Sequence, residues 1–224
     1  TGPAMDTSLE TARFNMIHQQ IRPWGVADER VLETLAAIPR EHFVPAAYRG
    51  LAYADIEIPL AQGQVMLSPK LIARMLQALN IGPDERILEI GTGSGYVTAC
   101  LNHLGGAVIS LEIEPALAEL AKGNLGDSDP RRLEVRVGDG LTGHIDGGPF
   151  DVIAITGSLP DASGLAGLVS QLAPHGRLFA ILGEDPAMAA SLITHGPEGF
   201  NRQSLFETSV PPLAKAPEPE RFVF

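Results

Sequence analysis

A glycine-rich segment is the part of the sequence best suited to ligand chemistry. Gly91-Thr92-Gly93-Ser94-Gly95 directly follows an apolar run and precedes a stretch that fits a helix. Glycines allow backbone N–H groups to approach a ligand closely, and the positive end of a helix favours negative groups. The dinucleotide-binding pattern G-x-G-x-x-G would need a glycine where Tyr96 stands. A pyrophosphate site is therefore not expected.

Two acidic residues end the next two apolar runs. Glu112 stands where a carboxylate can accept hydrogen bonds from both hydroxyls of a ribose. Asp139 follows the third run, and we expect it to flank an adenine base together with Gly140 and Leu141. This order predicts a nucleoside site without a phosphate binder. The alternative is that the glycines only form a tight turn and the acids are solvated strand ends, which the placement of both acids disfavours.

The elements that would position these residues alternate between strand and helix from residue 86 onward. Short apolar runs rich in β-branched residues are separated by helix-compatible stretches, which predicts parallel strands joined by crossovers in a doubly wound, mostly parallel α/β sheet. Beyond residue 182 the pattern predicts an antiparallel hairpin around the turn 196–199. The predicted strands are 86–90, 107–111, 133–137, 150–155, 177–182, 188–194 and 200–206, and the predicted helices among them are 94–104, 115–125 and 161–172.

The first eighty residues predict helices interrupted by prolines. The spacing of Thr7-Ser8-Leu9-Glu10 is that of a capping box, and the helix that it opens should end before Pro23. A second helix is predicted over 28–38. A third should begin with Ser68 as N-cap and Pro69 at the first helical position.

Length and composition predict one α/β domain. The 224 residues are 45% hydrophobic, enough to bury a core without disulfides, and the single cysteine has no bridging partner. The six histidines form no close ligand pair, so no metal site is expected. The net charge of −11 disfavours nucleic acid and anionic membranes as partners, and no apolar stretch approaches the length that spans a bilayer. We expect a cytoplasmic protein that is a monomer or weak oligomer. The expected division is an expression scar (1–4), a helical extension that covers the acceptor side (5–80), an α/β domain (81–210) and a Pro-rich tail without regular structure (211–224).

The run from Leu88 to Tyr96 resembles motif I of the class I S-adenosylmethionine-dependent methyltransferases. Glu112 and Asp139 stand at that family's next two cofactor positions. The resemblance implies a Rossmann-like fold, S-adenosyl-L-methionine as the cofactor and S-adenosyl-L-homocysteine as its product. It also implies that Glu89 orients the methionine end of the cofactor. The cofactor-binding residues that it implies are Glu89, Gly91, Thr92, Gly93, Ser94, Gly95, Glu112, Ile113, Asp139, Gly140 and Leu141.

Nearly the whole chain resembles a protein-L-isoaspartate O-methyltransferase. Residues 40–45 match that family's R-x-x-F-V-P signature, and Ile58-Pro59-Leu60, Gly63-Gln64 and 174–178 continue the resemblance in order. Members of that family methylate the free α-carboxylate of an isoaspartyl residue and so start repair through a succinimide. The implied partner is therefore an isoaspartyl-containing protein or peptide.

One segment departs from the family pattern. After Gly63-Gln64 the family typically reads Thr-Ile-Ser-x-Pro, and its serine is commonly assigned to the active site. Here Val65 replaces the threonine and Leu67 the serine, so no catalytic residue is assigned. Ser68 could substitute, but its place before a proline favours an N-cap. Isoaspartyl methylation is favoured, while another methyl acceptor and a non-catalytic cofactor-binding module stay open. The expected acceptor-side residues are Gln64, Val65, Leu67, Ser68 and Thr156.

Overall fold

A seven-stranded sheet forms the centre of the protein. The computed structural model describes the backbone of residues 3–218 and the side chains from residue 7 onward. The strand order is β5-β4-β3-β6-β7-β8-β9. The neighbours from β5 to β7 in this order pair in parallel, and β8 pairs antiparallel with both β7 and β9. The predicted doubly wound sheet with an antiparallel ending is confirmed. The strands are β3 (Arg86–Ile90), β4 (Ala107–Glu112), β5 (Leu133–Val137), β6 (Phe150–Leu159), β7 (Leu172–Glu184), β8 (Ala187–Gly196) and β9 (Gly199–Thr208).

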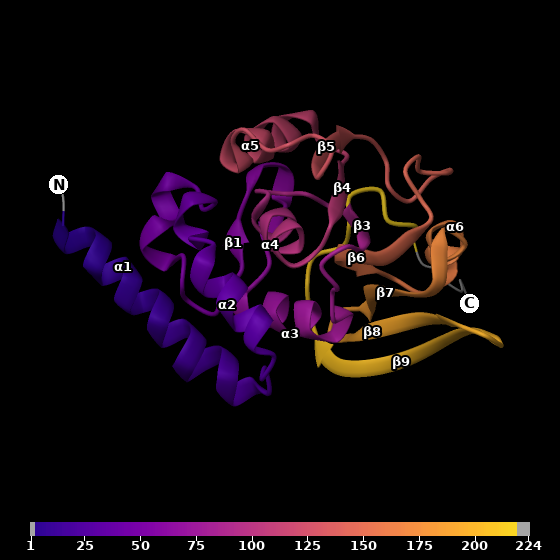
Figure 1. Cartoon of the computed structure of the whole chain (residues 1–224), viewed down its shortest axis with the longest axis horizontal. Coiled ribbons are helices and arrows are strands. Elements are labelled where there is room, and N and C mark those ends of the chain that lie inside the picture. Colours follow the sequence, from indigo (N-terminus) through magenta and orange to yellow (C-terminus); the bar gives the residue numbers. More distant parts are fainter. Residues whose placement is uncertain (1–2, 219–224) are drawn as a thin grey trace, which may run out of the picture.

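Helices cover both faces of this sheet (Figure 1). Helices α3, α4 and α5 lie on one side, where the N-terminal elements join them, and the short α6 lies on the other. The α-helices are α1 (Pro3–Asn15), α2 (Glu29–Ala37), α3 (Pro69–Leu79), α4 (Tyr96–Leu104), α5 (Pro115–Leu125) and α6 (Ala166–Val169). The remaining elements are a π-helix η1 (Met16–Ile21), the 3-10 helices η2 (Arg22–Trp24), η3 (Arg40–His42), η4 (Ala46–Leu51), η5 (Ala61–Gly63) and η6 (Ser163–Leu165), and a hairpin of β1 (Ile58–Pro59) and β2 (Val65–Met66). Within the described residues, no helix is both long enough and apolar enough to cross a membrane.

The N-terminal region shares its core with the sheet. Successive strand residues point to opposite faces, so Ile87 and Val152 pack on the side of the N-terminal helices while Leu88 and Ile153 pack on the side of α6. The first of these clusters also contains buried residues from η1, α2 and α3. The region before residue 80 is therefore an integral layer of the domain.

One prediction about helix starts fails in the N-terminal region. The capping box at Thr7 is wrong, because α1 already begins at Pro3 and Thr7 lies inside it. The run of α1 and η1 ends at Ile21, before Pro23 as predicted, and Pro23 lies in the separate 3-10 helix η2. The start of α2 is as predicted, with the Asp28 carboxylate accepting the N–H of Arg30 at 2.9 Å. Ser68 does occupy the N-cap position of α3, but its hydroxyl makes no capping hydrogen bond.

The chain after β5 departs from the prediction at one helix. The helix predicted over 161–172 shrinks to η6 and α6, because Gly164 and Gly167 weaken a helix and Leu172 already belongs to β7. The segment beyond 210 forms no helix or strand within the described residues, yet it is fixed against β6. Ser158 donates its N–H to the carbonyl of Pro211 at 3.1 Å, and Leu213 donates its N–H to the carbonyl of Ser158 at 3.0 Å. Residues 219–224 of the predicted tail lie outside the described residues.

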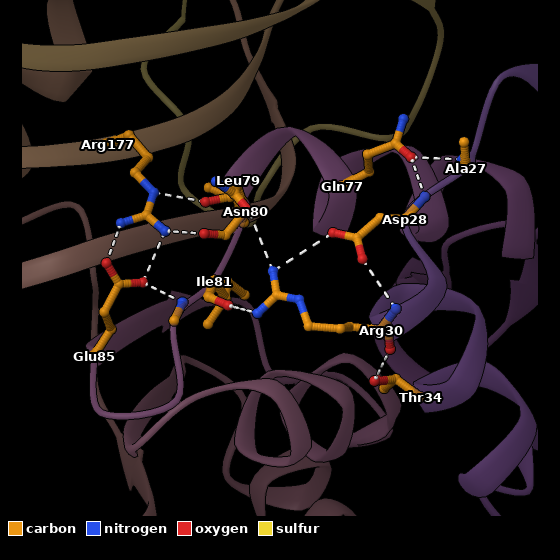
Figure 2. A network of polar contacts seen from close by, with 11 residues as sticks. Ala27, Asp28, Arg30, Thr34, Gln77, Leu79, Asn80, Ile81, Glu85 and Arg177 are labelled. Atoms are coloured by element: carbon orange, nitrogen blue, oxygen red, sulfur yellow. Dashed lines mark hydrogen bonds and ion pairs between the residues drawn. The ribbon is translucent and has the colours of Figure 1, made fainter.

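A polar network ties β7 to the loop between α3 and β3 (Figure 2). The Arg177 guanidinium donates to both carboxylate oxygens of Glu85, at 2.6 and 2.7 Å. It also donates to the carbonyls of Leu79 and Asn80, at 2.6 and 2.7 Å. All three of its nitrogens therefore have partners, and the pKa of Glu85 is lowered because these hydrogen bonds and the Arg177 charge outweigh its partial burial. The network fixes the base of the sheet and lines neither of the two cavities described below.

Candidate functional site

A cleft opens at the carboxyl ends of β3, β4, β5 and β6. In open α/β sheets, ligands bind where the strand order reverses. Here the reversal is at β3, because β4 and β6 lie on opposite sides of it in the sheet. The space inside the cleft, including the open solvent at its mouth, is about 530 Å³. We call it the large cleft. It is lined by Gln64, Val65, Ile90, Gly91, Gly93, Leu111, Glu112, Ile113, Gly138, Asp139, Gly140, Leu141, Thr156, Leu213 and Ala214.

Gly91 forms the floor of the large cleft in a conformation that other residues avoid. Its φ is +95°, and a Cβ atom there would overlap the hydroxyl oxygen of Thr156. A register shift in β6 between Ala154 and Ser158 accompanies this close approach. The Thr156 hydroxyl points to the carbonyls of Gly91 and Ile90, at 2.5 and 3.0 Å. Its one proton is thus used inside the protein, and the hydroxyl fixes the turn after β3.

Glu112 is held rigidly at the end of β4. One carboxylate oxygen, Oε2, accepts the N–H of Gly93 at 2.8 Å, and the other accepts the N–H of Glu114 at 3.1 Å. The side chain is 5% exposed, yet it lines the large cleft. A carboxylate has about four lone-pair sites, so two remain for a ligand. Glu112 therefore both supports the glycine loop and offers acceptors to the cleft.

Asp139 also lines the large cleft, in the loop after β5. Its Oδ1 accepts the N–H of Leu141 at 3.0 Å, which leaves Oδ2 without a protein partner among the described residues. Gly140 lets this loop approach β3, because a Cβ there would collide with Ile90. The large cleft thus carries two carboxylates, and its lining includes no Lys, Arg or His.

Glu89 does not line the large cleft. It is fully buried in β3, where its Oε2 accepts the hydroxyls of Thr98 at 2.5 Å and Ser110 at 2.6 Å. Burial raises the pKa of Glu89 to about 8, against the lowering effect of the two hydroxyls. At neutral pH the side chain is mainly the neutral acid. The Ser110 hydroxyl lies 2.6 Å from that of Thr92, so Glu89 is connected to the glycine loop through a chain of hydroxyls.

A second cavity adjoins the large cleft behind the glycine loop. This small hollow, with the open solvent at its mouth, measures about 300 Å³, and it shares Val65, Gly91, Gly93 and Thr156 with the large cleft. Its one cationic side chain among the described residues is that of Arg40, which has no exposed surface. The other residues around it are Met66, Leu67, Ile72, Thr92, Ser94, Tyr96 and Val97.

The structure brings most of the predicted site residues together. The exceptions are Glu89, which lies behind the loop, Gly95, which caps α4, and Ser68, which lines neither cavity. Sequence reasoning missed Leu213 and Ala214, because the proline-rich segment around them predicted no structure. It also gave no role to Arg40, although that residue opens the R-x-x-F-V-P run. The remaining missed residues are Ile90, Leu111, Gly138, Met66, Ile72, Tyr96 and Val97.

Comparison with known proteins assigns the family. A family model described as protein-L-isoaspartate(D-aspartate) O-methyltransferase matches residues 12–203. The chain belongs to this family. It is similar to a protein-L-isoaspartate O-methyltransferase of Koribacter versatilis, with 38% identity over 95% of this chain and 92% of that one. The corresponding protein of Gloeobacter violaceus is 38% identical over 89% of this chain and 97% of that one.

The fold of this family member is also that of solved structures. One is described as a protein-L-isoaspartate O-methyltransferase from Plasmodium falciparum in complex with S-adenosyl-L-homocysteine. It matches with a TM-score of 0.76 at 23% identity and covers 92% of this chain and 98% of that one. The sheet with its antiparallel ending is therefore the architecture of the family.

Proposed function

We propose that this protein is an S-adenosyl-L-methionine-dependent O-methyltransferase that methylates the α-carboxylate of L-isoaspartyl residues in proteins. Membership of the protein-L-isoaspartate O-methyltransferase family supports the reaction. The observation that carries the proposal is the large cleft, which places two carboxylates around a glycine loop at the reversal of strand order.

The side chains of the large cleft fit the proposed cofactor. Its lining has two acidic groups and no cationic one, which suits a nucleoside with a positive sulfonium and disfavours a phosphate. Glu112 would accept hydrogen bonds from the ribose hydroxyls with its remaining lone pairs. Oδ2 of Asp139 would accept a hydrogen bond from the adenine base. Gly91 supplies the close backbone approach that a side chain would block.

The cofactor supplies a methyl group on a sulfonium, which a carboxylate oxygen can take by in-line displacement. Because the acceptor carboxylate is already ionised at neutral pH, no residue has to remove a proton from it. The protein's contribution is then to orient the acceptor and to exclude water. Val65 and the 3%-exposed Leu67 provide an apolar wall for this purpose.

The same wall favours a second candidate, a methyltransferase of this fold that acts on a different acceptor. A site that hydrogen-bonds a polar group discriminates strongly against ligands that lack it, and apolar replacements lose that discrimination. Val65 and Leu67 are such replacements. A small molecule or another protein carboxylate would be the acceptor in that case.

Action in the cytoplasm as a monomer or weak oligomer completes the proposal, and the single cysteine without a bridging partner suits that compartment. The net charge of −11 supports the absence of nucleic acid and anionic membranes as partners.

A methyl-transfer assay with matched peptides tests the proposed function. Each peptide carries isoaspartate or aspartate at one position, and transfer from tritiated cofactor is measured at saturating cofactor concentration. We expect slow transfer to the isoaspartyl peptide and none to the aspartyl peptide. Binding of S-adenosyl-L-homocysteine without any transfer to isoaspartyl peptides would reject the isoaspartyl acceptor and leave a different acceptor or a non-catalytic cofactor-binding module.

A further inference from the structure

Arg40 is a buried cation whose hydrogen bonds are incomplete. It has no exposed surface, and its Nη2 donates to the carbonyl of Leu67 at 2.8 Å. Its Nε and Nη1 are also buried and have no hydrogen-bond partner among the described residues. No carboxylate of those residues forms an ion pair with it. The remaining contact is the ring of Tyr96, whose centroid lies 5.0 Å from Cζ.

This arrangement is energetically unfavourable in the protein alone. Burial lowers the pKa of Arg40, but a guanidinium stays protonated at neutral pH. Buried charges in proteins are normally paired, because an uncompensated one is strongly destabilising. A cation–π contact with Tyr96 offsets only part of that cost. The free donors of Arg40 therefore favour the binding of an anion.

Arg177 shows what a purely structural arginine looks like in the same protein. Each of its guanidinium nitrogens donates to the Glu85 carboxylate or to a backbone carbonyl (Figure 2). Arg40 has no carboxylate partner among the described residues, and it borders the small hollow beside the glycine loop. The other side chains of that hollow that carry hydroxyls are Thr92, Ser94, Tyr96 and Thr156, none of them charged.

We propose that the Arg40 guanidinium binds a ligand carboxylate that enters the small hollow. The inference rests on the proposed function, which brings two carboxylates to this region: that of the isoaspartyl acceptor and that of the cofactor's methionine end. Charge-assisted hydrogen bonds from a guanidinium would hold either one. For the acceptor, Arg40 would supply the polar contacts that Val65 and Leu67 no longer provide.

Arg40→Met tests the proposal, because methionine fills similar space without the charge. Arg30→Met is the matched control: Arg30 also donates to a backbone carbonyl, that of Ile81 at 2.8 Å, but lines neither cavity. Arg40→Lys keeps the charge with fewer donors and serves as the second variant. All variants are compared with wild type by thermal unfolding, peptide kinetics and calorimetry.

One pair of ligands addresses each source of the carboxylate. For the acceptor, the KM of an isoaspartyl peptide is compared with the inhibition constant of its isoasparagine analogue, which carries a carboxamide instead. For the cofactor, the Kd of S-adenosyl-L-homocysteine is compared with that of 5′-methylthioadenosine, which has no carboxylate. We expect Arg40→Met to weaken the carboxylate ligand of one pair at least tenfold and to change the other member less than threefold. We also expect the Tm of Arg40→Met to be no lower than that of Arg30→Met. The affinity of Arg40→Lys for the carboxylate ligand should lie between those of wild type and Arg40→Met.

Equal weakening of both members of each pair together with a lowered Tm would show that Arg40 only supports the Leu67 segment, and would overturn the proposal. No effect on either pair would overturn it as well. If wild type binds S-adenosyl-L-homocysteine but does not methylate the isoaspartyl peptide, the proposed function fails, and the cofactor pair alone decides the role of Arg40.

Discussion

Glu112→Gln should weaken binding of S-adenosyl-L-homocysteine by losing one hydrogen bond to the ribose. The carboxylate already accepts the N–H groups of Gly93 and Glu114, so its free lone pairs are the ones that face the large cleft. Replacing one oxygen by NH₂ removes one charge-assisted bond, worth about 1.5–3 kcal/mol. At ~1.4 kcal/mol per factor of ten, the Kd should rise roughly 10- to 150-fold.

The glycine loop complicates this measurement, because Glu112 also supports Gly93. A ligand pair separates the two roles: S-adenosyl-L-homocysteine and its 2′-deoxyribose analogue, both measured by calorimetry. Wild type should prefer the first about tenfold or more, and Glu112→Gln should reduce that preference to less than about threefold, as expected when one hydrogen bond to a charged group is lost. Glu119→Gln is the control, since Glu119 is 72% exposed on α5 and pairs with Lys122.

An unchanged preference in Glu112→Gln, with both ligands weakened equally, would refute the placement of the ribose. Glu112 would then act only through the loop. A weakened affinity in Glu119→Gln would instead point to the overall charge of the protein as the cause.

Three further predictions follow from the site. Restoring both hydroxyls with Val65→Thr and Leu67→Ser should raise kcat/KM for isoaspartyl peptides roughly 10- to 100-fold, and transfer that stays at background would contradict the isoaspartyl acceptor. Gly91→Ala should lower the free energy of unfolding by at least about 1–3 kcal/mol in urea titrations because of its positive φ, whereas Gly123→Ala, in the open interior of α5, should raise it by ~0.5–1 kcal/mol. Burial raises the pKa of Glu89 from 4.5 to about 8, so between these pH values the folded protein keeps a proton that the unfolded chain loses. The contribution of this group to the free energy of unfolding is complete below about pH 4.5 and is lost as the pH rises toward 8. The Tm of wild type should therefore fall relative to Glu89→Gln across that range, and parallel curves would show that Glu89 does not titrate there.

The strands and the two acids of the cleft could be predicted because their signals are local. The runs at 86–90 and 133–137 are short, β-branched and bounded by turn residues, and β3 and β5 have those limits. Helix α5 begins at Pro115 as predicted, since proline is well suited to a first helical turn. Because neighbouring parallel strands have their carboxyl ends at the same edge of the sheet, Glu112 and Asp139 line one cleft.

The features that could not be predicted depend on contacts between distant segments. Arg40 contacts the segment after β2, where its guanidinium donates to the carbonyl of Leu67. A short sequence window around either residue does not predict that contact. Leu213 follows two prolines, and only the pairing with Ser158 shows that its segment is ordered. For Glu89 the relevant signal was present: alternation in β3 puts it on the face of Ile87, toward Thr98 of α4, and not at the end of the strand.

The late position of Leu213 in the chain has a consequence for the large cleft. Leu213 forms part of its wall by lying against Gly91 and Gly157, and it follows every strand of the sheet along the chain. Its segment is held to β6 by the backbone hydrogen bonds of Ser158 with Pro211 and Leu213, so release of residues 210–214 would open one side of the cleft and leave the glycine loop and both acids in place. By reciprocity, a ligand that fills the cleft stabilises the docking of that late segment.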